Sequence, residues 1–223
     1  MNTPAPGDDV LAEAFPPFGL CITHEDMTLR MLHDADLPEY LALIRGPLYE
    51  DASVPWGFPW YQVPPAERVR NALLAQWAWR GGIRPERWFL ALGVYLDGRL
   101  IGCQDLAAHD FAARRVVSSG SWLALTYQGR GLGQQMRRLL LHFAFDHLGA
   151  QRAESSVILG NEASLGVSRA VGYELNGRRI EVRSNGRQEV QYVMVTPERF
   201  RRLDGEVQVT GLTDELRTML GAG

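Results

Sequence analysis

The sequence contains no lysine, and all 23 of its basic residues are arginine. This absence excludes a lysine nucleophile and a lysine Schiff base. Cysteine is almost as scarce, because only Cys21 and Cys103 occur and neither has CxxC or metal-ligand spacing. Isolated cysteines are typical of a reduced compartment, so we expect a cytoplasmic protein without a metal site.

Long apolar runs are also missing. No run approaches the ~18 residues that a membrane-spanning helix needs. The N-terminal stretch is acidic and contains proline, which does not fit a secretory signal. The net charge is -3, so no excess of positive charge indicates a nucleic-acid partner. We therefore expect neither a membrane nor a nucleic acid as a partner.

A length of 223 residues, with 46% of them hydrophobic, allows one domain with tails. Residues 1–19 contain four prolines and are expected to form a flexible arm. The domain is expected over residues 20–204, and residues 205–223 form a C-terminal tail that is helical at 213–220.

Hydrophobic periodicity predicts the order β-α-α-β-β-β-α-β-α-β-β. This order indicates an α/β chain whose mixed, mostly antiparallel central sheet is flanked by helices. Asp97-Gly98 predicts a tight hairpin, and Pro197 begins a last short helix. The expected strands cover 27–32, 87–97, 99–108, 115–125, 154–159, 173–184 and 187–196, and the main helices cover 34–44, 65–80, 132–147 and 161–171.

Three alternating glycines, Gly129, Gly131 and Gly133, lie directly before the helix predicted at 132–147. They could simply form a tight turn, but such a loop at a helix N-terminus also favours anion binding. A dinucleotide-binding fold is not supported, because the third glycine comes one residue early and Gln134 takes its place. A phosphate-binding P-loop is not supported either, because no GK[ST] follows.

The spacing of Gln128, Gly131 and Gly133 resembles the pyrophosphate loop of the GNAT N-acyltransferase superfamily, and the element order resembles the GNAT fold. A second motif of that superfamily, N-x-x-S-x-x-V followed by G-F/Y, is matched downstream by Asn161, Ser164, Val167, Gly172 and Tyr173. The resemblance is clearest over 115–173 and extends over 27–204. The Trp122-Leu123 pair is most similar to the ribosomal-protein-alanine acetyltransferase-like branch.

The resemblance implies an N-acyltransferase. It would move an acetyl or longer acyl group, such as succinyl, from an acyl-CoA co-substrate to a primary amine by direct transfer in a ternary complex, without a metal. The acceptor is left open between a small-molecule amine and a protein N-terminus, and a homo-oligomer is left open too. The alternative is a non-catalytic acyl-CoA-binding sensor module on the same fold.

The resemblance also implies where the donor lies. The strand at 121–125 would pair with the pantetheine arm, the N–H groups of 129–134 would hold the pyrophosphate, and the Leu123 N–H would be the oxyanion donor. Asn161 equally fits a helix cap, and Arg130 equally fits a solvated loop arginine. The implied donor-binding residues are Leu123, Leu125, Gln128, Gly129, Arg130, Gly131, Leu132, Gly133, Gln134, Asn161 and Ser164.

The same resemblance implies Ser164 as the proton donor to the leaving thiolate, although serine is also common in a first helical turn. Many relatives carry a glutamate base on the fourth strand, but that position is Val117 here. Asp105 on the preceding strand is the nearest acidic candidate, and His109 follows it, but each equally fits a structural or solvated role. The alternatives are a base that acts through water and an acceptor amine that binds already neutral.

Aromatic and hydroxyl side chains are the candidates for the acceptor site. The aromatic segment before the second helix is either core or a wall of that site in the family. Two serines of the 115–125 strand share the face of Val117. The residues assigned to acceptor binding are Trp56, Trp60, Tyr61, Ser119 and Ser121.

Overall fold

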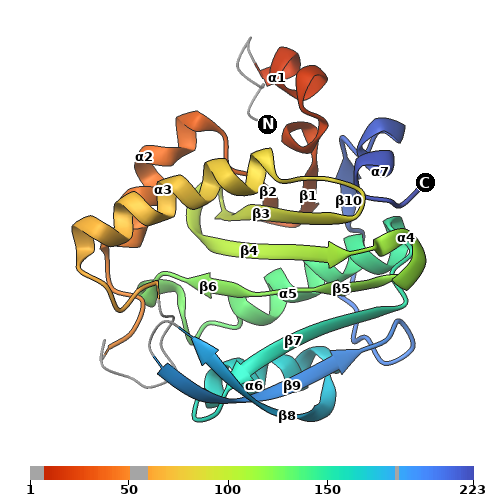
Figure 1. Cartoon of the computed structure of the whole chain (residues 1–223). Coiled ribbons are helices and arrows are strands. Elements are labelled where there is room, and N and C mark those ends of the chain that lie inside the picture. The colour runs from red at the N-terminus through yellow and green to blue at the C-terminus, as the bar shows by residue number, and fades with distance from the viewer. Residues whose placement is uncertain (1–7, 51–59, 184–185) are drawn as a thin grey trace.

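The computed structural model of the chain describes residues 8–50, 60–183 and 186–223. In this part of the chain one open sheet has the strand order β10-β1-β2-β3-β4-β5-β7-β9-β8, and β6 pairs with β4 (Figure 1). Among these described strands, β5 and β7 form the one parallel pair. The strands are β1 Cys21–His24, β2 Met27–Met31, β3 Arg87–Leu96, β4 Arg99–His109, β5 Val116–Ser118, β6 Ser121–Leu123, β7 Arg152–Ile158, β8 Glu174–Arg183, β9 Gly186–Val195 and β10 Gln208–Thr210.

Helices cover both faces of this sheet. The pair α2 and α3 packs on β3 and β4, whereas α5 packs on the opposite face beside α6 (Figure 1). A 3-10 turn precedes α2 at Asp34–Asp36, and a π-helical turn at Phe143–His147 continues α5. The helices are α1 Asp8–Ala14, α2 Leu37–Arg45, α3 Pro65–Gly81, α4 Phe111–Arg114, α5 Leu132–His142, α6 Glu162–Val171 and α7 Asp214–Met219.

The expected fold class, a mixed and mostly antiparallel sheet flanked by helices, is confirmed. The hairpin at Asp97-Gly98 is present, and both residues have positive φ, 49° and 76°, as a tight I′-type turn requires. Gly172 ends α6 with a φ of 108°.

The strand predicted over 115–125 is divided in two. Its first part, β5, lies between β4 and β7, and its second part, β6, pairs with β4 alone. The division occurs at Ser119 and Gly120. The Ser119 N–H is still bonded to the Glu154 carbonyl on β7, whereas the Gly120 carbonyl accepts from the Asp105 N–H on β4. The sheet therefore splits between β6 and β7.

Both ends of the chain differ from the sequence-based expectation. Residues 8–14 are helical, and Phe15 and Phe18 pack against the main core, so this part of the expected arm belongs to the fold. The expected C-terminal helix is present as α7, but β10 precedes it and pairs with β1. Residues 197–199 form only a turn, so the helix predicted at Pro197 is wrong.

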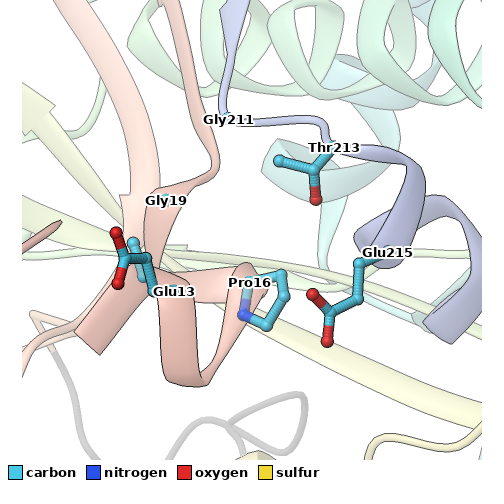
Figure 2. A pocket seen from close by; sticks show the side chains of 7 residues that line it. Glu13, Pro16, Gly19, Gly211, Thr213 and Glu215 are labelled. Atoms are coloured by element: carbon cyan, nitrogen blue, oxygen red, sulfur yellow. The ribbon is translucent and has the colours of Figure 1, made fainter. Parts of the chain in front are cut away.

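The two ends of the described chain lie side by side. A cavity of about 520 Å³ separates the first helical turns from α7, and Glu13 and Glu215 lie on its two sides (Figure 2). Leu216 and Leu220 of the C-terminal segment are fully buried. The Trp88 indole N–H donates to the Leu220 carbonyl over 2.9 Å, which anchors this segment to β3.

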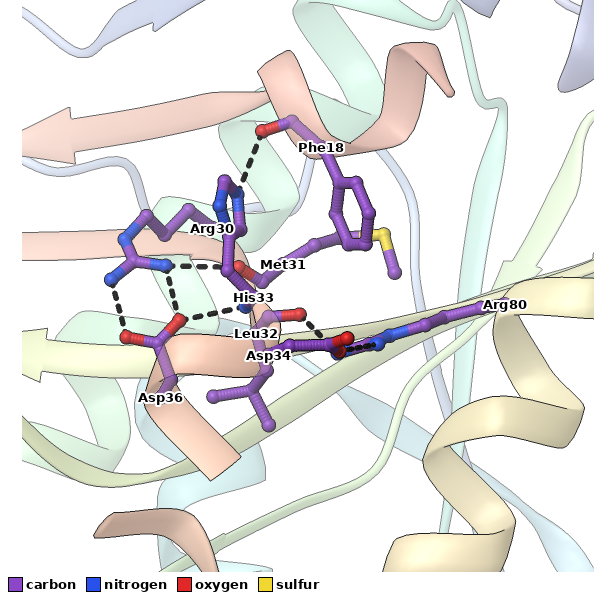
Figure 3. A network of polar contacts seen from close by, with 8 residues as sticks. All are labelled: Phe18, Arg30, Met31, Leu32, His33, Asp34, Asp36 and Arg80. Atoms are coloured by element: carbon purple, nitrogen blue, oxygen red, sulfur yellow. Dashed lines mark hydrogen bonds and ion pairs between the residues drawn. The ribbon is translucent and has the colours of Figure 1, made fainter. Parts of the chain in front are cut away.

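A polar network fixes the start of α2 and the end of α3 (Figure 3). The Arg30 guanidinium donates to both Asp36 carboxylate oxygens over 2.7 and 2.8 Å, and Asp36 also accepts from the His33 N–H. Arg80, at the end of α3, donates to Asp34 and to the Leu32 carbonyl. These bonds hold the two helices that cover one side of the cavity described below.

Candidate active site

The edge of β6 that faces away from β4 pairs with no other strand of the described chain. The Ala124 N–H donates to the Ile101 carbonyl, and the Asp105 N–H donates to the Gly120 carbonyl. Gly102 and Leu123, which lie opposite each other between these bonds, therefore form a non-hydrogen-bonded pair. The Leu123 N–H consequently points away from β4 and into the split, where an extended ligand can add to the strand.

The glycine loop closes one end of this split. Gly131 caps α5 with a φ of 81°, a conformation that a residue with a side chain adopts only with strain. The N–H groups of Gln134 and Gln135 bond to the Gly131 carbonyl, whereas the earlier N–H groups have no acceptor within the helix. These N–H groups, which bond to no acceptor in the described chain, and the helix dipole together favour an anion at this end of α5.

A cavity of about 350 Å³ lies on the α3 side of the split. One face of α3 forms a wall, and β4 and β6 form the opposite wall, so the cavity reaches Asp105, Gly120 and Ser121. Most of its exposed surface is aromatic and apolar, although six polar or charged side chains also line it, namely Arg68, Asn71, Gln76, Gln104, Asp105 and Ser121. The aromatic residues of the lining are Tyr40, Trp60, Trp79, Phe89 and Trp122.

Asp105 is the acidic residue of this cavity lining. Its Oδ1 accepts the Gly120 N–H over 2.6 Å, and a Cβ atom at Gly120 would lie only 2.8 Å from Oδ2. Glycine at 120 therefore lets the carboxylate lie against the backbone at the split. Burial raises the pKa of the Asp105 carboxyl from 3.8 to about 6, against the opposing effects of the Gly120 hydrogen bond and the Arg137 charge.

The chain matches the family model described as an acetyltransferase (GNAT) domain over residues 26–174. It belongs to the GNAT acetyltransferase family. YdaF of Bacillus subtilis (strain 168), assigned as a ribosomal N-acetyltransferase, is 26% identical over 162 residues, which cover 71% of this chain and 83% of YdaF.

Solved structures agree on the fold. RimL, a ribosomal alpha-N-protein acetyltransferase crystallised with coenzyme A, aligns with a TM-score of 0.61 at 17% identity over 78% of this chain and 95% of RimL. RimJ of Mycobacterium smegmatis aligns with a TM-score of 0.60 at 21% identity over 77% of this chain and 82% of RimJ.

The donor-site residues predicted for this GNAT chain lie around the split, but several have bonds within the protein. The Gln128 side chain donates to the carbonyls of Leu48 and Leu123, over 2.9 and 2.8 Å, and so braces the loop. The Leu125 N–H is bonded to the Pro47 carbonyl, and Leu125 begins a 3-10 turn. The stretch of strand that can pair with a ligand is thus 121–123, shorter than predicted, and at Leu123 only the N–H is open because the carbonyl accepts from Gln128.

The second motif is a helix cap. The Asn161 Oδ1 accepts the Ser164 N–H over 3.0 Å at the start of α6. Ser164 is half-buried there. The tip of α5 packs closely on the same helix, because a Cβ at Gly133 would lie 3.3 Å from Val167. Arg130 is exposed on the loop, with its guanidinium 5.7 Å from the Tyr127 ring centroid.

The predicted acceptor residues are only partly brought together. Trp60 and Ser121 line the cavity, whereas Trp56 lies outside the described residues. Tyr61 is buried behind the lining, where its hydroxyl bonds to Gly46 and Leu48. Ser119 is buried at the split.

The three positions considered for the general base lie in different surroundings. Val117, at the position of the expected glutamate, is fully buried in the core. His109 is exposed at the end of β4, outside the cavity lining. Asp105 alone of the three lies in that lining.

Four buried polar residues at the site were not predicted, and they are Arg68, Gln76, Gln104 and Arg137. Gln76 of α3 lines the cavity with an Oε1 that accepts no hydrogen bond from the described residues, and Arg137 of α5 donates to Ser121. Arg137 lies four residues before Leu141 on the buried stripe of its helix, and this position is the signal that could have identified it.

Within residues 8–50, 60–183 and 186–223, no helix is long and apolar enough to cross a membrane. The same residues contain no group of three or more His, Cys, Asp or Glu side chains placed to hold a metal ion.

Proposed function

We propose that this GNAT acetyltransferase transfers an acyl group from acyl-CoA directly to a primary amine, with Asp105 as the general base. One observation carries the proposal: the sheet splits at Gly120, directly beside the cavity in which the Asp105 carboxylate lies. A donor in the split and an amine in the cavity would then meet at this carboxylate.

The chemistry requires a neutral amine. Asp105, with a pKa of about 6, is mostly ionised at neutral pH and accepts a proton from the incoming ammonium or from the nitrogen as it attacks. The nitrogen bonds to the thioester carbonyl carbon, and the carbon–sulfur bond breaks. The Leu123 N–H, which faces the split, is the proposed donor to the developing oxyanion.

The thiolate of CoA leaves and takes up a proton, for which Ser164 at the start of α6 is the proposed donor. We propose no covalent enzyme intermediate. Cys103 is the cysteine of the cavity lining, and burial raises its thiol pKa well above the usual value. A thiol that stays protonated is a poor nucleophile.

The names of the relatives support a protein N-terminus as the acceptor, since YdaF is assigned as a ribosomal N-acetyltransferase and RimL as a ribosomal alpha-N-protein acetyltransferase. The reaction would then take place in the cytoplasm. The mainly apolar cavity suits an N-terminal residue with an apolar side chain. The acyl group is acetyl or a longer group such as succinyl.

The test uses purified protein with acetyl-CoA or succinyl-CoA and peptides that have a free N-terminus. Release of CoA thiol that requires the peptide is the expected result. N-terminally blocked peptides of the same sequence are the matched control and should release no thiol. Binding of CoA without turnover on any peptide or small amine would favour the sensor module instead.

A further inference from the structure

Arg137 is a buried cation that is bonded to no carboxylate among the described residues, although its charge acts on the Asp105 carboxyl. Its side chain is 3% exposed, and within that part of the chain its only hydrogen bond is from Nη2 to the Ser121 Oγ, over 3.1 Å. Nε and Nη1 are buried without a hydrogen-bond partner, and in the described chain Arg137 forms no ion pair. A buried guanidinium in this state is costly, which makes an anionic ligand the natural partner.

Further polar atoms without partners in the described chain accompany it. The guanidinium carbon lies 5.8 Å from the ring centroid of Tyr173, whose buried hydroxyl has no hydrogen-bond partner. Ser119, two residues before Ser121 at the division of β5 from β6, has a buried hydroxyl that is also unpaired. Arg137 and Tyr173 therefore offer unpaired hydrogen-bond donors that an acyl methyl group could not use, and the Ser119 hydroxyl is a further unpaired donor at the division of the strand.

The position of Arg137 decides which part of a donor it faces. The phosphates of an acyl-CoA would bind at the glycine loop and the N-terminus of α5. Arg137 lies five residues further along that helix than its first residue, Leu132. Along β6, Leu123 presents its N–H to the split, and Ser121, the partner of Arg137, lies two residues further from the loop. The guanidinium is thus beyond the proposed thioester position, at the acyl end of the split.

We infer that Arg137 and the donors beside it bind a carboxylate at the far end of the acyl group, so that the preferred donor is a dicarboxylic acyl-CoA thioester of the succinyl type. This inference rests on the proposed function, because it assumes that an acyl-CoA lies in the split. Each transfer would leave an amide with a terminal carboxylate, which converts a cationic amine into an anionic product.

The test measures equilibrium binding by titration calorimetry without any amine, using succinyl-CoA, butyryl-CoA and free CoA. Butyryl-CoA has the same number of acyl carbon atoms without the carboxylate. The wild-type protein should bind succinyl-CoA about 10–100-fold more tightly than butyryl-CoA, the range for charge-assisted hydrogen bonds. Arg137→Gln should abolish this preference and leave the affinity for butyryl-CoA unchanged.

Two further variants keep the test decisive if Arg137→Gln folds poorly. Arg137→Lys keeps the charge without the bidentate geometry and should retain part of the preference. Arg138→Gln, the matched control on the same helix, removes an arginine that donates to the Ala170 carbonyl and should keep the full preference.

Failure of the carboxylate site and failure of the proposed function would give different binding results. If CoA and butyryl-CoA bind but succinyl-CoA binds no more tightly, the carboxylate site is wrong and the proposed function stands. If Arg137→Gln weakens all three ligands equally, Arg137 has only a structural role and the inference is overturned. If none of the three binds to the wild-type protein, the proposed function falls and the inference falls with it.

Discussion

The Asp105 carboxyl combines a hydrogen bond that favours its charge with burial that opposes it, and burial dominates. The unfolded chain would titrate near 3.8 at this residue and the folded chain at about 6. Between these values the folded state binds more protons, so the free energy of unfolding decreases as pH rises and has lost this contribution above about pH 6. A carboxylate that destabilises the fold at neutral pH is typical of a functional residue.

Asp105→Asn should therefore separate activity from stability. We expect kcat/KM for amine transfer to fall by about 10²–10⁴, the usual contribution of a general base. The melting temperature at pH 8 should not fall, because the variant no longer carries a buried charge. The wild-type kcat/KM should show a limb that rises with an apparent pKa of about 6, and the Asp105→Asn variant should lack this limb.

Glu215→Gln provides the control, because this carboxylate lies at the cavity between the chain ends (Figure 2). This variant should leave kcat/KM unchanged, and kcat/KM should still rise with an apparent pKa of about 6, as in the wild-type protein. A wild-type pH profile without that limb, or full activity in Asp105→Asn, would remove Asp105 from the role of base.

Single residues differ in how far the sequence predicts them. The Asn161 cap is local, because its bond partner Ser164 is three residues away, and the spacing predicts it. Arg137 depends on contacts with β6 and with Tyr173, which are distant in sequence. Its surroundings therefore became evident only from the fold.

The strand from 116 to 123 shows the same limit for an element. Alternation predicts that it is extended, but the division at Gly120 arises because β5 pairs with β7 and β6 does not. Pairing between elements is not encoded in the period of one segment. The glycine loop was predictable, because Gly131 and the first turn of α5 form one local unit.

Gly131→Glu should prevent CoA binding. The new side chain would place a negative charge at the free N–H groups of α5, and its Cβ would strain a backbone with a φ of 81°. We expect the affinity for CoA to fall at least about 100-fold, in line with the loss of several charge-assisted hydrogen bonds. Titration calorimetry with free CoA measures the effect.

Gly149→Glu is the matched control for this loop variant. Gly149 has a similar φ of 72°, and no atom of the described chain lies within 4 Å of a Cβ placed there, so the strain and the charge are reproduced away from the loop. Its CoA affinity should equal that of the wild-type protein. Equal CoA binding by Gly131→Glu and Gly149→Glu would contradict the assignment of the loop as the phosphate site.

At the scale of the whole molecule, both ends of the chain complete the fold beyond the 26–174 match to the family model. The sheet continues from β2 through β1 to β10, and α7 covers the end of the core (Figure 1). Neither the pairing of β10 with β1 nor the burial of α7 follows from the weak periodicity of the last residues. Both depend on surface that β1 and β3 provide.

Leu216 of α7 tests whether this tail belongs to the cooperative unit. The side chain is fully buried in the main core, and truncation leaves a cavity, so Leu216→Ala should lower the free energy of unfolding by about 2–5 kcal/mol. Val182→Ala, at a side chain that is 85% exposed on β8, should change it by no more than about 0.5 kcal/mol. Urea unfolding followed by circular dichroism measures both.

CoA affinity well below the transition should be unchanged in Leu216→Ala, because α7 contributes no residue to the cavity or the glycine loop within the described chain. A loss of less than about 1 kcal/mol would mean that the tail unfolds separately from the core, and the domain would then end near residue 204, as the sequence suggested.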